Sequence, residues 1–244
     1  ISHQLYVADR VARQLYPRAL LADEVGLGKT IEAGLILHRL ISSGRTRRAL
    51  ILVPPSLQHQ WLVEMRRRFN LPCSLVEPEW FERGDAANPL EGAQLLICNL
   101  DLITGLPAAA RSALGAAWDL LIVDEAHHLA WSPEDSSLGY QIVAELAAAT
   151  PGVLLLTATP EQLGQAGHFA RLHLLDPERF ADYDEFLAAE AAFGPVTALA
   201  ERLLDGAEPT AEDRARLGEL GVLDGPADTD VLLQRLLDRH GTSR

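Results

Sequence analysis

The fold is decided by the stretch LLADEVGLGKTIEAGLIL, which runs from Leu20 to Leu37. Ala19–Ala22 is a short apolar run of the kind that forms a buried parallel strand. From Thr30 onward the apolar residues recur at helical spacing. A strand, a glycine-bearing loop and a helix are the context of the phosphate-binding pattern G-x-x-x-x-G-K-[ST]. The stretch departs from this pattern at its first position, Asp23, so a tight turn that caps an ordinary helix is the alternative.

The loop brings three kinds of group to a phosphate. Gly26 and Gly28 allow positive φ and close approach of backbone N–H groups, and the helix start adds partial positive charge. Lys29 supplies a point charge for the outer phosphates, and the Thr30 hydroxyl is a ligand for Mg²⁺. We therefore predict a nucleotide site made of Asp23, Glu24, Val25, Gly26, Leu27, Gly28, Lys29 and Thr30.

A second stretch, WDLLIVDEAHHL from Trp118 to Leu129, carries two adjacent carboxylates. They follow the apolar run Leu120–Val123, and unpaired charge at the end of a buried strand is costly. This favours a functional role over a helix-capping Asp-Glu pair. Such a role exists if Asp124 holds Mg²⁺ and Glu125 orients or deprotonates the attacking water. Lys29, Asp124 and Glu125 are the predicted catalytic residues, gathered where ligands of open α/β sheets bind.

Four blocks of the sequence resemble the motifs of one family. DEVGLGKT, DEAH and TATP (Thr157–Pro160) are similar to the first three motifs of superfamily 2 helicase-like ATPases. VPPSLQHQWLVEM (Val53–Met65) resembles the next motif of the SWI/SNF-type branch, in which Asp is common at the first loop position. Asp23 is therefore typical of the branch. Further blocks, from LLADEVGLGKTIEAGLILH to DRHGTSR, resemble its bacterial RNA polymerase-associated members over nearly the whole chain.

The resemblance implies both a fold and a function. The fold is α/β, a RecA-like P-loop domain with a parallel sheet flanked by helices and a helical C-terminal appendage. The function is that of the ATP-binding lobe of a translocase on double-stranded DNA that recycles RNA polymerase in transcription, with ATP and Mg²⁺ as cofactors. Alternatives are a lobe of another SWI/SNF-type remodeller or superfamily 2 helicase, and a protein-docking module with a vestigial nucleotide site.

The resemblance also implies roles for single residues. Gln4 matches a glutamine that relatives use to read adenine, although a polar residue at a helix start is the alternative. His127, Thr157 and Thr159 match positions that couple the phosphate site to the rest of the motor, while Thr159 could also simply close a strand. The positions that match contacts to the DNA backbone are Pro54, Ser56, Asn99 and Asp101.

Nothing after Pro160 resembles the second RecA-like lobe, which closes over ATP in this family and brings arginine fingers. We therefore expect residues 1–175 to form the first motor lobe, with the second lobe acting in cis. Residues 176–244 are expected to form a mostly helical, acidic appendage that leads towards it. Residues 176–230 hold 4 Lys/Arg against 15 Asp/Glu, so most of the net charge of −13 lies there.

Composition limits the remaining possibilities. Arg45, Arg47, Arg48 and Arg66–Arg68 are groups that either meet nucleic-acid phosphates or form solvated helix ends. Two cysteines without metal-binding spacing suit a reducing bacterial cytoplasm. No apolar run or leader predicts a membrane segment. His127 and His128 are expected to point apart, so zinc is discounted, and the tryptophans, including Trp61, are assigned to packing.

Alternation of apolar runs and helical patterns predicts a doubly wound parallel sheet. The predicted strands are Ala19–Ala22, Ala49–Val53, Ser74–Val76, Gln94–Cys98, Leu120–Val123 and Val153–Leu156. The predicted helices between them are Ile31–Ile41, Leu57–Phe69 and Gln141–Ala148, and residues 84–92 are expected to form an exposed loop. Five helices are predicted after Leu163: Ala166–Leu174, Asp184–Phe193, Val196–Leu204, Glu212–Leu220 and Val231–Leu237.

Overall fold

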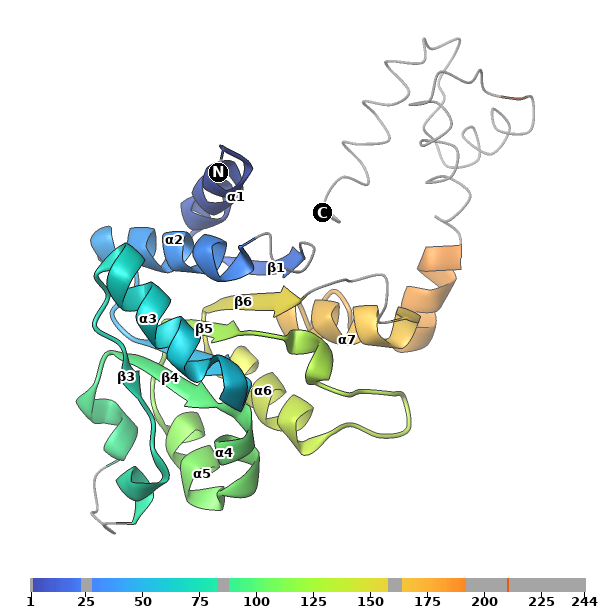
Figure 1. The fold of residues 1–244 in the computed structure, drawn as a ribbon. Coiled ribbons are helices and arrows are strands. Elements are labelled where there is room, and N and C mark those ends of the chain that lie inside the picture. The colour runs from blue at the N-terminus through green and yellow to red at the C-terminus, as the bar shows by residue number, and fades with distance from the viewer. Residues whose placement is uncertain (1, 23–27, 83–87, 158–163, 192–209, 211–244) are drawn as a thin grey trace. The chain divides into compact units, whose positions relative to one another are not determined.

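A single parallel sheet organises the protein. The computed structural model describes residues 2–22, 28–82, 88–157, 164–191 and 210. Within them the sheet has six strands in the order β1-β6-β5-β2-β4-β3, and every pairing is parallel (Figure 1). The strands are β1 Arg18–Ala22, β2 Ala49–Val53, β3 Ser74–Leu75, β4 Leu95–Asn99, β5 Leu120–Val123 and β6 Gly152–Thr157. This order is that of a doubly wound α/β fold.

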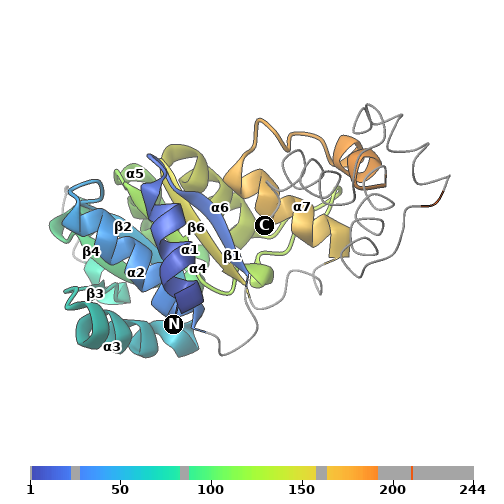
Figure 2. The same ribbon diagram turned by 90° about the horizontal axis from the view of Figure 1, so that it is seen from above.

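Helices cover both faces of the sheet. They are α1 Ser2–Arg13, α2 Lys29–Ser42, α3 Gln58–Phe69, α4 Leu100–Gly105, α5 Pro107–Gly115, α6 Leu138–Ala149 and α7 Gly164–Leu175. One apolar cluster joins α1, α2 and α3 to one face, and a second joins α4, α5, α6 and α7 to the other. Figure 2 looks down on the face that α1 and α2 cover.

The central strands are buried on both sides. In β2 the side chains alternate between the two clusters, with Ile51 in the first and Leu50 and Leu52 in the second. Because both faces need apolar side chains, β2 and β5 are continuous apolar runs rather than alternating ones. This is why the sequence predicted both strands with their observed ends, Ala49–Val53 and Leu120–Val123.

Other predicted elements differ in part from the structure. The predicted exposed loop at 84–92 is wrong at its end, because Pro89–Gly92 forms a 3-10 turn, η3, that buries Leu90. Helices α1, α4 and α5 were not predicted. Residues 183–191 are helical and overlap the predicted helix Asp184–Phe193, beginning one residue earlier. The predictions Val196–Leu204, Glu212–Leu220 and Val231–Leu237 lie outside the described residues.

The chain divides into two compact units, residues 1–183 and 184–244. The predicted boundary at residue 175 coincides with the last residue of α7, and the division into an ATP-binding lobe and an appendage stays a prediction. Of the helices that the structure describes, none combines the length and the apolar composition that crossing a membrane requires.

Candidate nucleotide-binding site

The predicted site residues lie at or just after the carboxyl ends of the parallel strands, which form one rim of the sheet. Register brings the ends together: Ala22 pairs with Thr157, and Val53 pairs with Asn99. The backbone N–H of Asp124, the residue after β5, donates to Leu52 O at 2.8 Å. Loops that leave these strands therefore share one rim, as ligand-binding loops do in open α/β sheets.

Helix α2 begins at this rim, directly after the glycine loop. Gly28 is its N-cap and has φ 92°, a left-handed conformation that suits glycine. Its carbonyl accepts from Ile31 N at 2.8 Å and from Glu32 N at 3.0 Å, which starts the helix. Lys29 is buried and Thr30 is half-buried in the first turn. The predicted phosphate-contacting residues Asp23, Glu24, Val25, Gly26 and Leu27 lie outside the described residues.

Gln4, on α1, lies against the start of α2. A Cβ placed on Gly28 would come within 2.5 Å of the Gln4 side-chain nitrogen Nε2. The amide of Gln4 therefore lies beside the end of the glycine loop, although 24 residues separate the two in sequence. The role of Gln4 in reading adenine stays a prediction.

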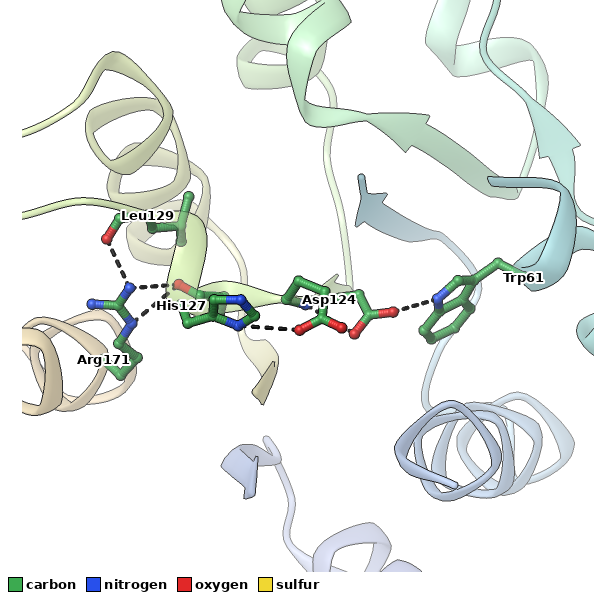
Figure 3. A network of polar contacts seen from close by, with 7 residues as sticks. Trp61, Asp124, His127, Leu129 and Arg171 are labelled. Atoms are coloured by element: carbon green, nitrogen blue, oxygen red, sulfur yellow. Dashed lines mark hydrogen bonds and ion pairs between the residues drawn. The ribbon is translucent and has the colours of Figure 1, made fainter. Parts of the chain in front are cut away.

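Asp124 is a buried carboxylate with two oriented donors. Its Oδ2 accepts from Trp61 Nε1 at 2.7 Å, and its Oδ1 accepts from the backbone N–H of Glu125 at 2.9 Å (Figure 3). Burial raises the pKa of Asp124, while the hydrogen bond from Trp61 and the nearby charge of Lys29 act in the opposite direction. The charge of Lys29 therefore favours the ionised form of Asp124.

Glu125 and His127 occupy a tight turn after β5. Glu125 has φ 49°, an uncommon conformation for a residue other than glycine, and caps the 3-10 turn η4, Ala126–His128. His127 Nδ1 lies 3.1 Å from Glu125 Oε2, although neither atom makes a hydrogen bond among the described residues. Burial and the neighbouring His128 lower the pKa of His127, against an opposite effect of Glu125. This favours neutral imidazole beside the carboxylate.

The expectation that His127 and His128 point apart is wrong. Their ring centroids are 4.1 Å apart in the 3-10 turn, and the ring planes are tilted by 43° to each other. In the part of the chain that the structure describes, no three His, Cys, Asp or Glu side chains form a group that could hold a metal.

Arg171 is a residue of this site that the sequence did not indicate. It lies on α7 and is 2% exposed, and its guanidinium donates to the carbonyls of Ala126 at 2.6 Å and Leu129 at 2.8 Å (Figure 3). A second bond to Ala126 O comes from Nε at 3.1 Å, and a bond to Gly167 O at 2.9 Å stays within α7. Arg171 therefore fixes both ends of the turn that follows Glu125. The sequence shows it only as a single arginine in an apolar helical pattern.

The other predicted coupling residues lie at the end of β6. Thr157 is its last residue, is fully buried, and its hydroxyl has no hydrogen-bond partner within the described ranges. Thr159 lies outside the described residues. The coupling role of both threonines stays a prediction.

The predicted nucleic-acid contacts lie along the same rim, after β2 and β4. Pro54 and Ser56 lie between β2 and α3 and are partly exposed and exposed, respectively. Asn99 caps α4, because its Oδ1 accepts from Leu102 N at 2.6 Å, and Asp101 is exposed in the first turn. Asn99 therefore has a structural role, and contact with DNA stays a prediction for all four.

The basic groups lie at the opposite edge of the sheet and have contacts of their own. Arg45 donates to the carbonyls of Ala12 and Gln14, which close α1. Arg48 donates to Leu90 O at 2.8 Å and lies over the ring of Trp118. These arginines precede β2, so they lie far from the rim that carries Asp124. Their positions favour the structural alternative over contact with the nucleic acid at the rim.

The described residues fit a Mg²⁺–phosphate site. Mg²⁺ is usually held by one or two carboxylates together with substrate phosphates, so a cluster of several protein ligands is not required. Asp124 supplies a carboxylate that keeps acceptor positions beyond its two donors. Thr30 and Lys29 stand in the first turn of α2, where a helix N-terminus also favours anions.

Comparison with known proteins places the sequence among characterised families. It matches the SNF2-related domain family over residues 10–217. It is 52% identical to the RNA polymerase-associated protein RapA of Stutzerimonas stutzeri and 50% identical to RapA of Photobacterium profundum, over 100% of this chain. The chain spans 27% of the length of each of these relatives.

Solved structures share the fold. The Sulfolobus solfataricus SWI2/SNF2 ATPase core in complex with dsDNA superposes with a TM-score of 0.63 at 18% identity, covering 76% of this chain and 37% of that one. The ATPase core domain from the same organism gives a TM-score of 0.60 at 16% identity, covering 88% and 40%. At these identities the likeness concerns the fold, and it agrees with the predicted RecA-like α/β sheet.

Proposed function

Since the chain belongs to the family of SNF2-related domains, we propose that it is the ATP-binding lobe of a double-stranded DNA translocase that acts on bacterial RNA polymerase in the cytoplasm. The polymerase is proposed because relatives at 50–52% identity are named RNA polymerase-associated protein RapA. DNA is proposed because a structural neighbour was solved in complex with dsDNA. Recycling of polymerase in transcription follows as the expected role.

The observation that carries the proposal is the position of the buried Asp124 carboxylate and of Lys29, in the first turn of α2, at one rim. A carboxylate buried after β5 loses solvation, which its raised pKa reflects, and a stable fold does not need that loss. Lys29 is also the only lysine in the chain, against 20 arginines. A docking module with a vestigial nucleotide site would have no use for this pair, so the alternative of another class is disfavoured.

Each residue then has one task. The start of α2 and Lys29 bind the phosphates, with Asp23–Gly28 as the loop that wraps them and Gln4 beside the adenine. Thr30 and Asp124 would hold Mg²⁺, which when bound neutralises charge on the phosphates. Glu125 orients the attacking water and accepts its proton. Neutral His127 beside it couples the phosphate site to the neighbouring loops.

The rim divides between two proposed ligands. The nucleotide groups follow β1, β5 and β6, and the proposed DNA contacts Pro54, Ser56, Asn99 and Asp101 follow β2 and β4. A second RecA-like lobe in cis would close over this rim and bring arginines to the γ-phosphate. Another SWI/SNF-type remodeller remains the second candidate, because the same family and fold would serve it equally.

The sole lysine gives a direct test of nucleotide binding. An amine-reactive reagent should label Lys29 and the chain's amino terminus, and Mg²⁺·ATP should protect Lys29 alone, as peptide mass spectrometry would report. Lys29→Ala should remove most affinity for a fluorescent ATP analogue, because the phosphates lose their charged partner. Lys29→Arg is the matched control for charge. Unchanged labelling with ATP, or unchanged affinity in Lys29→Ala, would contradict the proposed site.

A further inference from the structure

Trp61 and Asp124 form a buried contact between two halves of the rim. Trp61 belongs to the first turn of α3, which follows β2, while Asp124 follows β5. The indole Nε1 donates to Asp124 Oδ2 at 2.7 Å, across 63 residues of sequence (Figure 3). Trp61 is 0% exposed and Asp124 is 8% exposed, so water does not compete for either group.

Apolar packing around Trp61 holds its ring, and with it the N–H, in a fixed direction. The ring belongs to the apolar cluster that α1, α2 and α3 form against the sheet. An indole has one hydrogen-bond donor and no acceptor, so Trp61 can donate to a partner but cannot accept from one. The fixed ring therefore determines the direction from which its N–H donates to Asp124 Oδ2.

The second carboxylate oxygen is held independently. Asp124 Oδ1 accepts from the backbone N–H of Glu125 at 2.9 Å. Two donors on two different oxygens define the plane of the carboxylate. Each oxygen has a further acceptor position beyond the one donor that the described residues give it. The carboxylate is therefore oriented before any ligand arrives, which lowers the entropy that binding must remove.

Core packing alone does not explain this contact. A second buried tryptophan, Trp118, donates its Nε1 to a main-chain carbonyl, Ala113 O, at 2.9 Å. Such a neutral partner is the usual one for a buried indole. Trp61 instead donates to a buried carboxylate, a stronger, charge-assisted bond.

We propose that Trp61 is a positioning residue that holds the Asp124 carboxylate in the orientation in which it ligates Mg²⁺ of a bound nucleotide. This inference rests on the proposed function of the rim. Because α3 begins directly after Pro54–Leu57, the same hydrogen bond ties the candidate DNA loop after β2 to the metal ligand after β5.

The test compares Trp61→Phe with Trp118→Phe in the 244-residue chain. Each variant keeps an apolar ring and loses one buried N–H. Affinity for a fluorescent ADP analogue is measured with Mg²⁺ and with EDTA. Trp61→Phe should lose about 10-fold in the Mg²⁺-dependent affinity, the lower end for residues that orient a metal ligand. Its affinity in EDTA should match that of the unaltered chain, and Trp118→Phe should match it in both conditions.

A spectroscopic measurement leaves Trp61 in place. The chain has four tryptophans, so 5-fluorotryptophan labelling gives four ¹⁹F signals, assigned by Phe substitution at Trp80, Trp118 and Trp131 and by elimination. On addition of Mg²⁺·ADP the Trp61 signal should shift and the Trp118 signal should stay, whether or not Trp61→Phe folds.

The outcomes separate the two proposals. Absence of nucleotide binding by the unaltered chain would overturn the proposed function and this inference with it. Mg²⁺-dependent binding that Trp61→Phe leaves unchanged, or a Trp61 signal that does not respond, would overturn the inference alone. Equal losses in Mg²⁺ and in EDTA would show that Trp61 only supports the fold, which also overturns it.

Discussion

Gly28 is the residue at which a single added carbon should have the clearest effect. Its φ of 92° is one that side-chain-bearing residues rarely adopt, and an added Cβ would meet Gln4 Nε2 at 2.5 Å. We expect Gly28→Ala to destabilise the loop by about 1–3 kcal/mol and to displace Gln4. Affinity for a fluorescent ATP analogue should therefore fall at least several-fold, as equilibrium titration would measure.

Gly44 provides the matched control for this substitution. It has φ 74° and no heavy atom within 4 Å of an added Cβ, so it shares the backbone strain without the contact. Gly44→Ala should lose stability in thermal unfolding and still bind the nucleotide as the unaltered chain does. If both variants bound equally well, the contact between Gly28 and Gln4 would have no part in the site.

Asp124 should reveal a conflict between stability and function. Its pKa is raised by burial, so the carboxylate favours the fold most when it is protonated, and that contribution is lost as pH rises through the folded-state pKa. At neutral pH the native state thus bears the cost of a buried charge. We expect Asp124→Asn to abolish Mg²⁺-dependent stabilisation by nucleotide. Without nucleotide the variant loses the buried charge but also one accepted hydrogen bond, because an amide has one oxygen for the two donors.

The pH dependence checks the sign of this effect. The unaltered chain should gain stability relative to Asp124→Asn as pH falls towards the carboxylate range, because only its carboxyl can become neutral. Melting curves at several pH values in the presence of EDTA would measure this gain. A stability difference that does not change with pH would contradict a pKa raised by burial.

At the residue scale, the sequence singled out candidates by their chemistry, and their roles in a site stay predictions. Asp124 and Lys29 are conspicuous because charge beside an apolar strand is rare, and the structure brings them to one rim. Trp61 was predicted as a packing residue, which its full burial confirms, but its hydrogen bond depends on a partner 63 residues away. No local pattern encodes such a contact.

Between elements, Arg171 is the main polar link from α7 to the turn after β5. Arg171→Met keeps the length of the side chain and removes its bonds to the carbonyls of Ala126, Leu129 and Gly167. Buried carbonyls without a donor are costly, so the free energy of unfolding should fall by about 2–5 kcal/mol. Urea denaturation of the purified chain measures this loss.

Arg111 on α5 is the control for Arg171. It is exposed, so Arg111→Met should change the free energy of unfolding by no more than about 0.5 kcal/mol. Equal effects of the two substitutions would show that the turn after Glu125 holds its shape without α7.

At the scale of elements, the strands that are buried on both faces were the easiest to predict from the sequence. The buried strands β2 and β5 have continuous apolar runs with abrupt polar ends, so their limits were visible in the sequence. Helix α5 buries only Ala109 and Ala113, and α4 has six residues, so neither shows a strong periodic pattern. Asn99, assigned to DNA from the resemblance, also caps α4, a use that the resemblance did not indicate.

For the molecule as a whole, the proposed function implies that the site is one wall of a cleft which a second lobe would complete. A second lobe would bring positive charge to the γ-phosphate, and losing an arginine finger costs about 10³–10⁵ in rate. That is roughly 4–7 kcal/mol at ~1.4 kcal/mol per decade. We expect the 244-residue chain to bind ATP or ADP weakly and to release phosphate negligibly, with or without duplex DNA.

A steady-state phosphate-release assay on the purified chain tests this expectation. The acidic residues 176–230, with 15 Asp/Glu against 4 Lys/Arg, should further discourage DNA near that segment. DNA-stimulated turnover would mean that this chain carries a complete active site, for example by self-association, and the one-wall account would then be wrong.

The strand order has a consequence during synthesis on the ribosome. β1 leaves the ribosome early, but its partner in the sheet is β6, and Arg18 pairs with Val153, 135 residues later. At about 5–20 residues per second, translation needs roughly 7–27 s to supply that partner. Throughout this interval the nascent chain keeps Leu20 and Leu21 without their strand neighbours Leu155 and Leu156. The glycine loop that follows β1 can therefore be set in place only after translation has passed the end of β6.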